Sequence, residues 1–191
     1  MITSNSLRNS AQNKFVSVAN AEAEISGAEP HRAKAADGTV PGAVGWKLPG
    51  FGPEARVLTT IGEVPAKLLR RNDQIVTPSG QPCEIEWIDR VGLDEGFLKS
   101  VPGAAPVLVR TGAFGRDLPS RDIWMSRMQT IVMGARLDDM QTAEELGEDA
   151  AWEGGALAYT MFHCGRPVLA RVEGLWCRVD EISTRKGRRA V

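Results

Sequence analysis

The chain has 191 residues, 42% of them hydrophobic, and its 23 basic and 24 acidic side chains leave a net charge of −1. This length is sufficient for the core of one domain, and the balanced charge provides no general attraction to nucleic acid or to an anionic membrane. No apolar run approaches the roughly 20 residues of a membrane-spanning helix, and Met1–Phe15 lacks the apolar segment of a secretory signal, so we expect no nucleic-acid or membrane partner.

The three cysteines, Cys83, Cys164 and Cys177, are an odd number without regular spacing. This pattern argues against a disulfide framework and favours reduced thiols in a cytoplasmic protein. A metal site could combine them with His163, but no C-x-x-C spacing supports it, and neighbours on a strand point to opposite faces. Cys83 could be a nucleophile, although its alternation with apolar residues favours the core. We therefore predict neither a metal nor a cofactor.

Residues 1–46 contain few large apolar side chains and are predicted to be disordered or loosely attached to the domain. A short helix over Asn20–Ile25 is the one element that the pattern there permits. Pro41-Gly42 and Pro49-Gly50 mark the approach to the domain, which we expect to begin near Trp46.

From Arg56 onward the pattern predicts short β-strands separated by Pro and Gly turns, which indicates an all-β fold rather than βαβ units. In one run, Cys83, Ile85 and Trp87 alternate with two glutamates, so we expect Trp87 to be buried, as well as Val109. The predicted strands are Arg56–Thr59, Gln74–Thr77, 83–87, Val107–Arg110, Ile131–Met133, Leu157–Phe162, Val168–Val172 and Leu175–Val179. Residues 136–155 are acidic and are expected to be mostly solvated, with a helical turn at Thr142–Leu146.

Residues 50–77, GFGPEARVLTTIGEVPAKLLRRNDQIVT, combine a strand, a tight turn at Ile61-Gly62, the motif G-E-V-P, an apolar turn and a second strand. This stretch resembles the opening of Hedgehog/intein (Hint) modules of the bacterial type. That family begins with a cysteine and an aromatic residue, followed by Pro, a strand, "G-E-V/K-P-V-E-x-L" and "G-D-x-V-x-T". The chain departs from this pattern at Gly50, where the family has its nucleophilic cysteine.

Two later stretches are similar to the same family. Pro106–Ser126, PVLVRTGAFGRDLPSRDIWMS, resembles "P-V-x-I-R-x-G-A-L-G-x-x-L-P-x-R-D-L-x-x-S". Arg166–Glu181, RPVLARVEGLWCRVDE, resembles the final strands, "H-x-V-x-x-A-E-G-L-x-x-E-S". The resemblance thus covers about residues 47–182 and implies the compact, twisted all-β horseshoe of Hint modules, with residues 183–191 left as a basic tail.

The activity that this resemblance implies is self-cleavage, in which the first residue attacks the preceding peptide bond and a histidine in "S/T-x-x-H" protonates the departing amine. Three positions of this chain match the family's site, and none retains its chemistry: Gly50 has no side chain, Gln129 replaces the histidine, and Arg166 stands near the last histidine. A glutamine cannot transfer a proton at neutral pH. No catalytic residue is therefore expected.

We accordingly expect a Hint-like domain without enzymatic activity that serves as a structural or binding module, with a protein as its partner. The alternative is active autoprocessing through a non-standard nucleophile such as Thr59, Thr60 or Ser126. A third interpretation is a small β-domain enzyme or nucleic-acid binder unrelated to Hint.

Two polar groups have a structural and a functional interpretation. Asp117, Arg121 and Asp122 could form a polar site, but pairing and backbone hydrogen bonds within their loop are the favoured role. The basic run Arg185–Arg189 could contact nucleic acid or acidic lipid, although a solvated tail is the favoured interpretation because no aromatic residues are interleaved.

Overall fold

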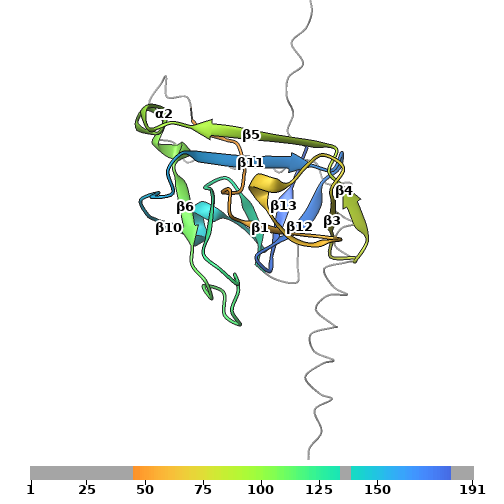
Figure 1. Cartoon of the computed structure of the whole chain (residues 1–191). Helices are drawn as coiled ribbons and strands as arrows, with labels where there is room; N and C mark the ends of the chain where they lie inside the picture. Colours follow the sequence, from red (N-terminus) through yellow and green to blue (C-terminus); the bar gives the residue numbers. More distant parts are fainter. Residues whose placement is uncertain (1–44, 134–138, 182–191) are drawn as a thin grey trace, which may run out of the picture.

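The computed structural model describes residues 45–133 and 139–181 and shows a mostly β protein whose strands curl into a horseshoe (Figure 1). The predicted fold class is therefore confirmed. The expected helix over Asn20–Ile25, residues 1–44 and the tail 183–191 lie outside the described residues. The strands are β1 (Arg56–Thr59), β2 (Gly62–Pro65), β3 (Gln74–Val76), β4 (Pro82–Glu84), β5 (Trp87–Leu93), β6 (Pro106–Val109), β7 (Ile123–Ser126), β8 (Thr130–Val132), β9 (Met140–Thr142), β10 (Glu148–Asp149), β11 (Leu157–His163), β12 (Val168–Val172) and β13 (Leu175–Val179).

The largest sheet has the order β4-β3-β1-β12-β13-β8-β9, with β2 paired to β1. All of its ladders are antiparallel, and β12 and β13 form a hairpin in which Val172 lies opposite Leu175. Its two turn residues, Glu173 and Gly174, both have positive φ. The Glu173 carboxylate is buried and accepts hydrogen bonds from the Arg56 backbone and the Ser120 hydroxyl, which joins the hairpin to the neighbouring loop.

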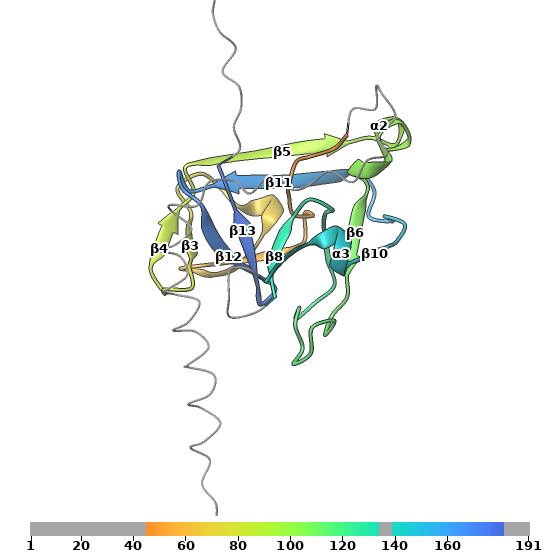
Figure 2. The same cartoon turned by 180° about the vertical axis from the view of Figure 1, so that it is seen from behind.

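Two smaller ladders complete the horseshoe. One has the order β10-β6-β7, and the other is the long pair β5–β11, which lies across one side of the molecule in both views (Figures 1 and 2). Phe51 joins them, because it bridges to Met125 of β7 and to Thr160 of β11. The chain therefore inserts between two strands just after Gly50.

Short helices connect some of these strands: the 3₁₀ turns η1 (Ala66–Leu68) and η2 (Pro102–Ala104) and the α-helices α2 (Glu95–Ser100) and α3 (Ala143–Leu146). The Asp94 carboxylate caps α2 by accepting from the Phe97 amide, and a Thr142–Glu145 capping box starts α3. The expected helical turn at Thr142–Leu146 is thus confirmed. No described helix has both the length and the apolar character required to cross a bilayer.

The main core lies inside the horseshoe and is built from alternate residues of its strands. Cys83, Ile85 and Val109 are buried in it, as the alternation predicts. The expectation that Trp87 is buried is wrong: it is only half-buried. The predicted strand over 83–87 ends at Glu84, and Trp87 begins a separate strand, β5. Among the described residues β5 pairs only with β11, so its other edge, beside Trp87, has no strand partner.

The acidic stretch is more ordered than its composition predicts. Within residues 139–149 it forms β9, α3 and β10. Strand β9 pairs with β8, and β10 pairs with β6. Strand β7 and helix α2 were also missed by the sequence pattern. In β7 all but Trp124 are buried, so its four residues show no simple alternation.

Candidate functional site

The structure brings together two of the three positions that the sequence resemblance assigns to the family's site. Gly50 and Gln129 both line a small pocket of about 10 Å³ that is completed by residues of β11 and by the end of β13. Arg166 does not take part: it is exposed in the turn between β11 and β12. Arg178 and Asp180 line the pocket in its place, and the Arg178 Nε lies 2.8 Å from one Asp180 oxygen and 2.9 Å from the other.

Gly50 is buried and fixed by backbone hydrogen bonds on both strands beside it. Its carbonyl oxygen accepts from the Ser126 amide at 2.9 Å, and the next residue, Phe51, exchanges hydrogen bonds with Thr160 at 3.0 and 2.8 Å. A Cβ atom at Gly50 would lie 2.9 Å from the Cβ of Tyr159 and 3.3 Å from the Cγ of Met161. The position therefore lacks a nucleophile and also lacks room for the first atom of any other side chain.

The Gln129 side chain is almost fully buried and is used structurally. Its Nε2 donates to the carbonyl oxygen of Arg178 at 2.8 Å and to that of Thr130 at 3.2 Å. Its own backbone accepts from the Ala143 amide at 2.8 Å. The carboxamide thus connects the start of β8 to the end of β13, and it has no proton to transfer at neutral pH.

Ser126 holds the segment that precedes Gly50. Its hydroxyl donates to the carbonyl oxygen of Leu48 at 2.7 Å and accepts from the Trp46 indole Nε1 at 3.0 Å and from the Met128 amide at 3.3 Å. Trp46 also packs against Tyr159 and Phe97, with ring centroids 5.8 and 6.1 Å apart. The upstream flank of Gly50 is therefore part of the folded structure, and the buried Ser126 hydroxyl has all its hydrogen-bonding capacity in use.

The other two alternative nucleophiles lie away from the pocket. Thr59 is buried in β1, and its hydroxyl donates to the Gly62 carbonyl at 2.6 Å within the β1–β2 turn. Thr60 is exposed in the same turn. Neither lines the pocket beside Gly50.

The cysteines are free and buried. Burial, together with the neighbouring thiol of Cys83, raises the pKa of Cys164, and burial raises the pKa of Cys177 to about 12. High pKa values disfavour the thiolate, which is the nucleophilic and metal-binding form. Within the described part of the chain, no group of His, Cys, Asp and Glu side chains could hold a metal ion. His163 instead stacks on Trp87 at 5.4 Å and its Nδ1 accepts from the Gly165 amide.

Of Asp117, Arg121 and Asp122, only Asp122 makes the pairing and backbone hydrogen bonds that were predicted for their loop. Asp122 accepts from the backbone amide and the hydroxyl of Thr111 at 2.8 and 2.9 Å and from Arg110 at 3.2 Å. The two hydrogen bonds from Thr111, more than the guanidinium, lower the pKa of Asp122. Asp117 and Arg121 are exposed, and Asp117 has a φ of 56°. Asp122 thus helps to hold the loop, together with the backbone hydrogen bonds that Gly112 and Phe114 donate within it.

Four residues around the pocket were not found by sequence reasoning. Tyr159 and Met161 close the space beside Gly50, and Arg178 and Asp180 replace Arg166 at the pocket. The family motif gave no signal for them because it marks the positions of reactive groups, whereas these residues act by shape and by backbone position.

Comparison with known proteins supports one family. No curated protein matches the chain. Among solved structures, the MchDnaB-1 intein is similar with a TM-score of 0.42 and 10% identity, over 68% of this chain and 99% of the intein. A variant of the Ssp DnaB mini-intein has a TM-score of 0.45 and 10% identity, over 72% of this chain and 97% of that one. The model of the Hint domain family matches residues 49–147, and the chain therefore belongs to the Hint domain family.

Proposed function

We propose that this Hint domain does not cleave itself and acts as a structural or binding module. The single observation that carries the proposal is the packing at Gly50. An acyl shift at the Pro49–Gly50 bond needs a nucleophile on the side chain that follows the bond, and the nearest atom of Tyr159 would lie 2.9 Å from the first atom of such a side chain.

Two further observations support the same proposal. The Gln129 carboxamide is bound to the Arg178 carbonyl, so the position of the family's proton donor holds two strands together. The pocket's one carboxylate, Asp180, faces the Arg178 guanidinium. Both Asp180 oxygens lie within hydrogen-bond distance of the Arg178 Nε, so this carboxylate is engaged in a structural pair at the pocket.

The unit that would serve as this module runs from about residue 47 to residue 182, with residues 1–46 and the basic residues 183–191 attached to it. The contacts of Trp46 with Ser126 and Tyr159 support a boundary close to Trp46. An intact module of this form would keep its upstream segment permanently attached.

A fusion tests the proposal. A reporter protein placed ahead of residue 1 should remain joined to the domain for days at neutral pH, with or without added thiol or hydroxylamine, because no ester can form at Gly50. Release of the reporter with a new amino terminus at Gly50 would support the alternative, active autoprocessing by a non-standard nucleophile, and would refute the proposal.

A further inference from the structure

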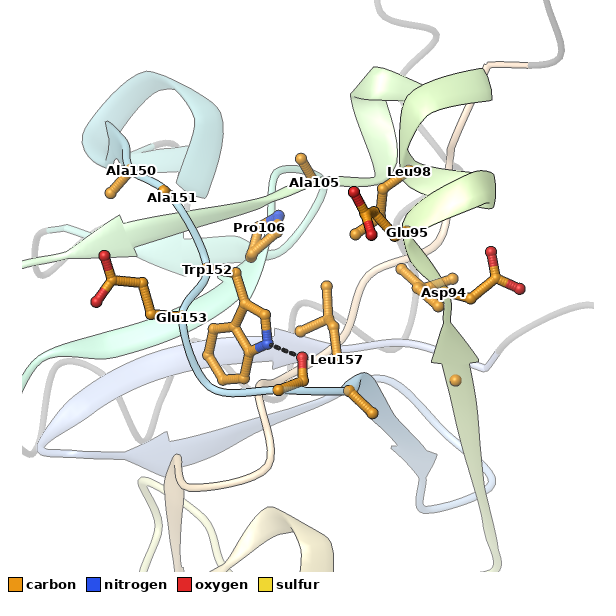
Figure 3. A pocket seen from close by; sticks show the side chains of 14 residues that line it. Asp94, Glu95, Leu98, Ala105, Pro106, Ala150, Ala151, Trp152, Glu153 and Leu157 are labelled. Atoms are coloured by element: carbon orange, nitrogen blue, oxygen red, sulfur yellow. Dashed lines mark hydrogen bonds between the residues drawn. The ribbon is translucent and has the colours of Figure 1, made fainter.

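A large hollow of the described surface lies between α2 and the segment 150–157. Its volume is about 920 Å³, and its apolar lining includes Leu93, Leu98, Pro106 and Leu157. In Figure 3, Glu95 and Leu98 lie on one side and Trp152 and Glu153 on the other, with Pro106 and Leu157 between them. This volume is within the range of clefts that bind ligands.

A second hollow of about 430 Å³ continues the first on the far side of Trp152. The two share Ala151, Trp152 and Glu153, so they form a groove with the Trp152 indole as a ridge. The indole is fixed, because its Nε1 donates to the Gly155 carbonyl at 2.8 Å and its ring meets Trp124 edge-on at 5.3 Å. An occupant of both hollows must be long and must cross the ridge, which suits a polypeptide segment better than a compact molecule.

The lining of the groove carries only negative charge. Neither hollow is lined by a lysine or arginine, and their five acidic residues are Asp94, Glu95, Glu153, Glu54 and Asp122. Glu95 pairs with Lys99, Glu54 with Lys67, and Asp122 with Arg110, but all three pairs are exposed and contribute little. Within the described ranges no basic side chain pairs with Glu153. The groove is thus complementary to a positively charged segment.

An unpaired strand edge leads into the groove. Among the described residues β5 pairs with β11 alone, and its last residues, Gly92 and Leu93, line the larger hollow. The outer position of β5 is plain in both views of the molecule (Figures 1 and 2). An exposed edge of this kind binds an extended peptide by backbone hydrogen bonds, which leaves alternate side chains free to reach neighbouring pockets.

We propose that this groove binds an extended segment of a partner protein that carries arginine or lysine between small or apolar residues. The inference rests on the proposed function, because it names the partner chemistry of an intact binding module. The basic side chains would meet Glu95 and Glu153, and the apolar ones would cover Leu98 and Trp152.

The experiment uses the full chain and two labelled nine-residue peptides followed by fluorescence anisotropy. One peptide has arginine at alternate positions with leucine or alanine between them, and the other has glutamate in place of arginine. We expect saturable binding of the first peptide only, and its affinity should fall as the salt concentration rises. Equal binding of the two peptides, or binding of neither, would overturn the proposal.

Variants locate the binding site. The double variant Glu95→Gln and Glu153→Gln should bind the arginine peptide about fivefold more weakly, as two exposed charge pairs are lost. Gly92→Val should abolish most binding, because a Cβ there meets nothing within 4 Å in the folded chain and would project into the free space. The matched pair Glu63→Gln and Glu84→Gln, exposed on β2 and β4, should leave binding unchanged. Equal weakening by both pairs would refute the site.

The chain's own basic run is the competing occupant. A variant with serine at Arg185, Lys186, Arg188 and Arg189 should bind the arginine peptide as the unchanged protein does. If the peptide binds only to this variant, the groove belongs to the chain's own tail, and the partner proposal fails. These results are independent of self-cleavage, which the mass of the chain reports separately.

Discussion

The Gln129 side chain donates a 2.8 Å hydrogen bond to the backbone carbonyl of Arg178, at the position that the sequence resemblance assigns to the family's catalytic histidine. Gln129 is 1% exposed, so this bond is made away from water. A residue that is buried and bonded to the end of another strand contributes to stability, and this contribution can be measured apart from any catalytic role.

Gln129→Met should lower the free energy of unfolding by about 1–3 kcal/mol, because the side chain keeps its size while the Arg178 carbonyl loses its donor. Urea denaturation followed by tryptophan fluorescence measures the change. The control is Gln141→Met, which is exposed on β9 beside the same strand and should change stability by less than about 0.5 kcal/mol. Equal effects of the two substitutions would contradict a structural role for Gln129.

Gly50→Ala should destabilise the protein by about 1–3 kcal/mol, because the added Cβ meets the Cβ of Tyr159 at 2.9 Å. Tyr159→Ala would not relieve the contact, because alanine keeps the Cβ atom that the new side chain meets. The control is Gly45→Ala, where an added Cβ has nothing within 4 Å and stability should be unchanged. A stable Gly50→Ala variant would show that the site has room for a side chain.

The same contact predicts the outcome of an attempt to restore the family's residues. Gly50→Cys combined with Gln129→His should yield a less stable protein that still does not cleave, because the Cβ of the new cysteine must displace Tyr159 or the strand that carries it. Thermal unfolding and an electrophoretic time course would check both statements. Thiol-dependent cleavage by this double variant would show that the scaffold keeps the geometry of an active site.

Ser126→Ala should loosen the segment before Gly50. It removes the hydrogen-bond partner of the Leu48 carbonyl, the Trp46 indole and the Met128 amide, with an expected cost of about 1–3 kcal/mol. Limited proteolysis should then cut between residues 46 and 50 sooner than in the unchanged protein. Ser100→Ala is the control, since the Ser100 hydroxyl makes one exposed bond within α2. An unchanged cleavage pattern in Ser126→Ala would mean that Trp46 packing alone holds the segment.

Stability should fall in alkaline solution. Burial raises the pKa of Cys177 to about 12, whereas an unfolded cysteine has a pKa of about 8.5. The contribution of the protonated Cys177 thiol to stability is complete below about pH 8.5. It is lost between that pH and about 12, because there the unfolded chain releases a proton that the folded chain retains. Urea midpoints measured across this range should fall, and those of Cys177→Ala should fall less steeply. Identical slopes would contradict the burial of this thiol.

The sequence predicted the strands whose residues alternate most regularly, because period-2 alternation reflects burial on one face of a sheet. Arg56–Thr59, Val168–Val172 and Leu175–Val179 match the observed strands end for end. Alternation does not report where a strand ends, so 83–87 was taken as one element, although Glu84 ends β4 and Trp87 begins β5. The strands β9 and β10 depend on packing against β8 and β6, and that packing has no local pattern.

The candidate site was predictable as far as the motif extends. Gly50 and Gln129 lie at one pocket, as the resemblance implies, while Arg166 lies elsewhere. Arg166 lies in the turn between β11 and β12, and a motif match does not fix where those strands end. The packing of Tyr159 against Gly50 joins residues more than 100 positions apart, and this contact follows from the fold alone.

The mass of the whole chain tests the central claim most directly. Freshly purified protein, and the same sample after days at neutral pH with added thiol, should show one species of about 20.7 kDa by intact-mass spectrometry. Appearance of two fragments whose masses correspond to cleavage at the Pro49–Gly50 bond would contradict the claim that this domain has lost self-cleavage.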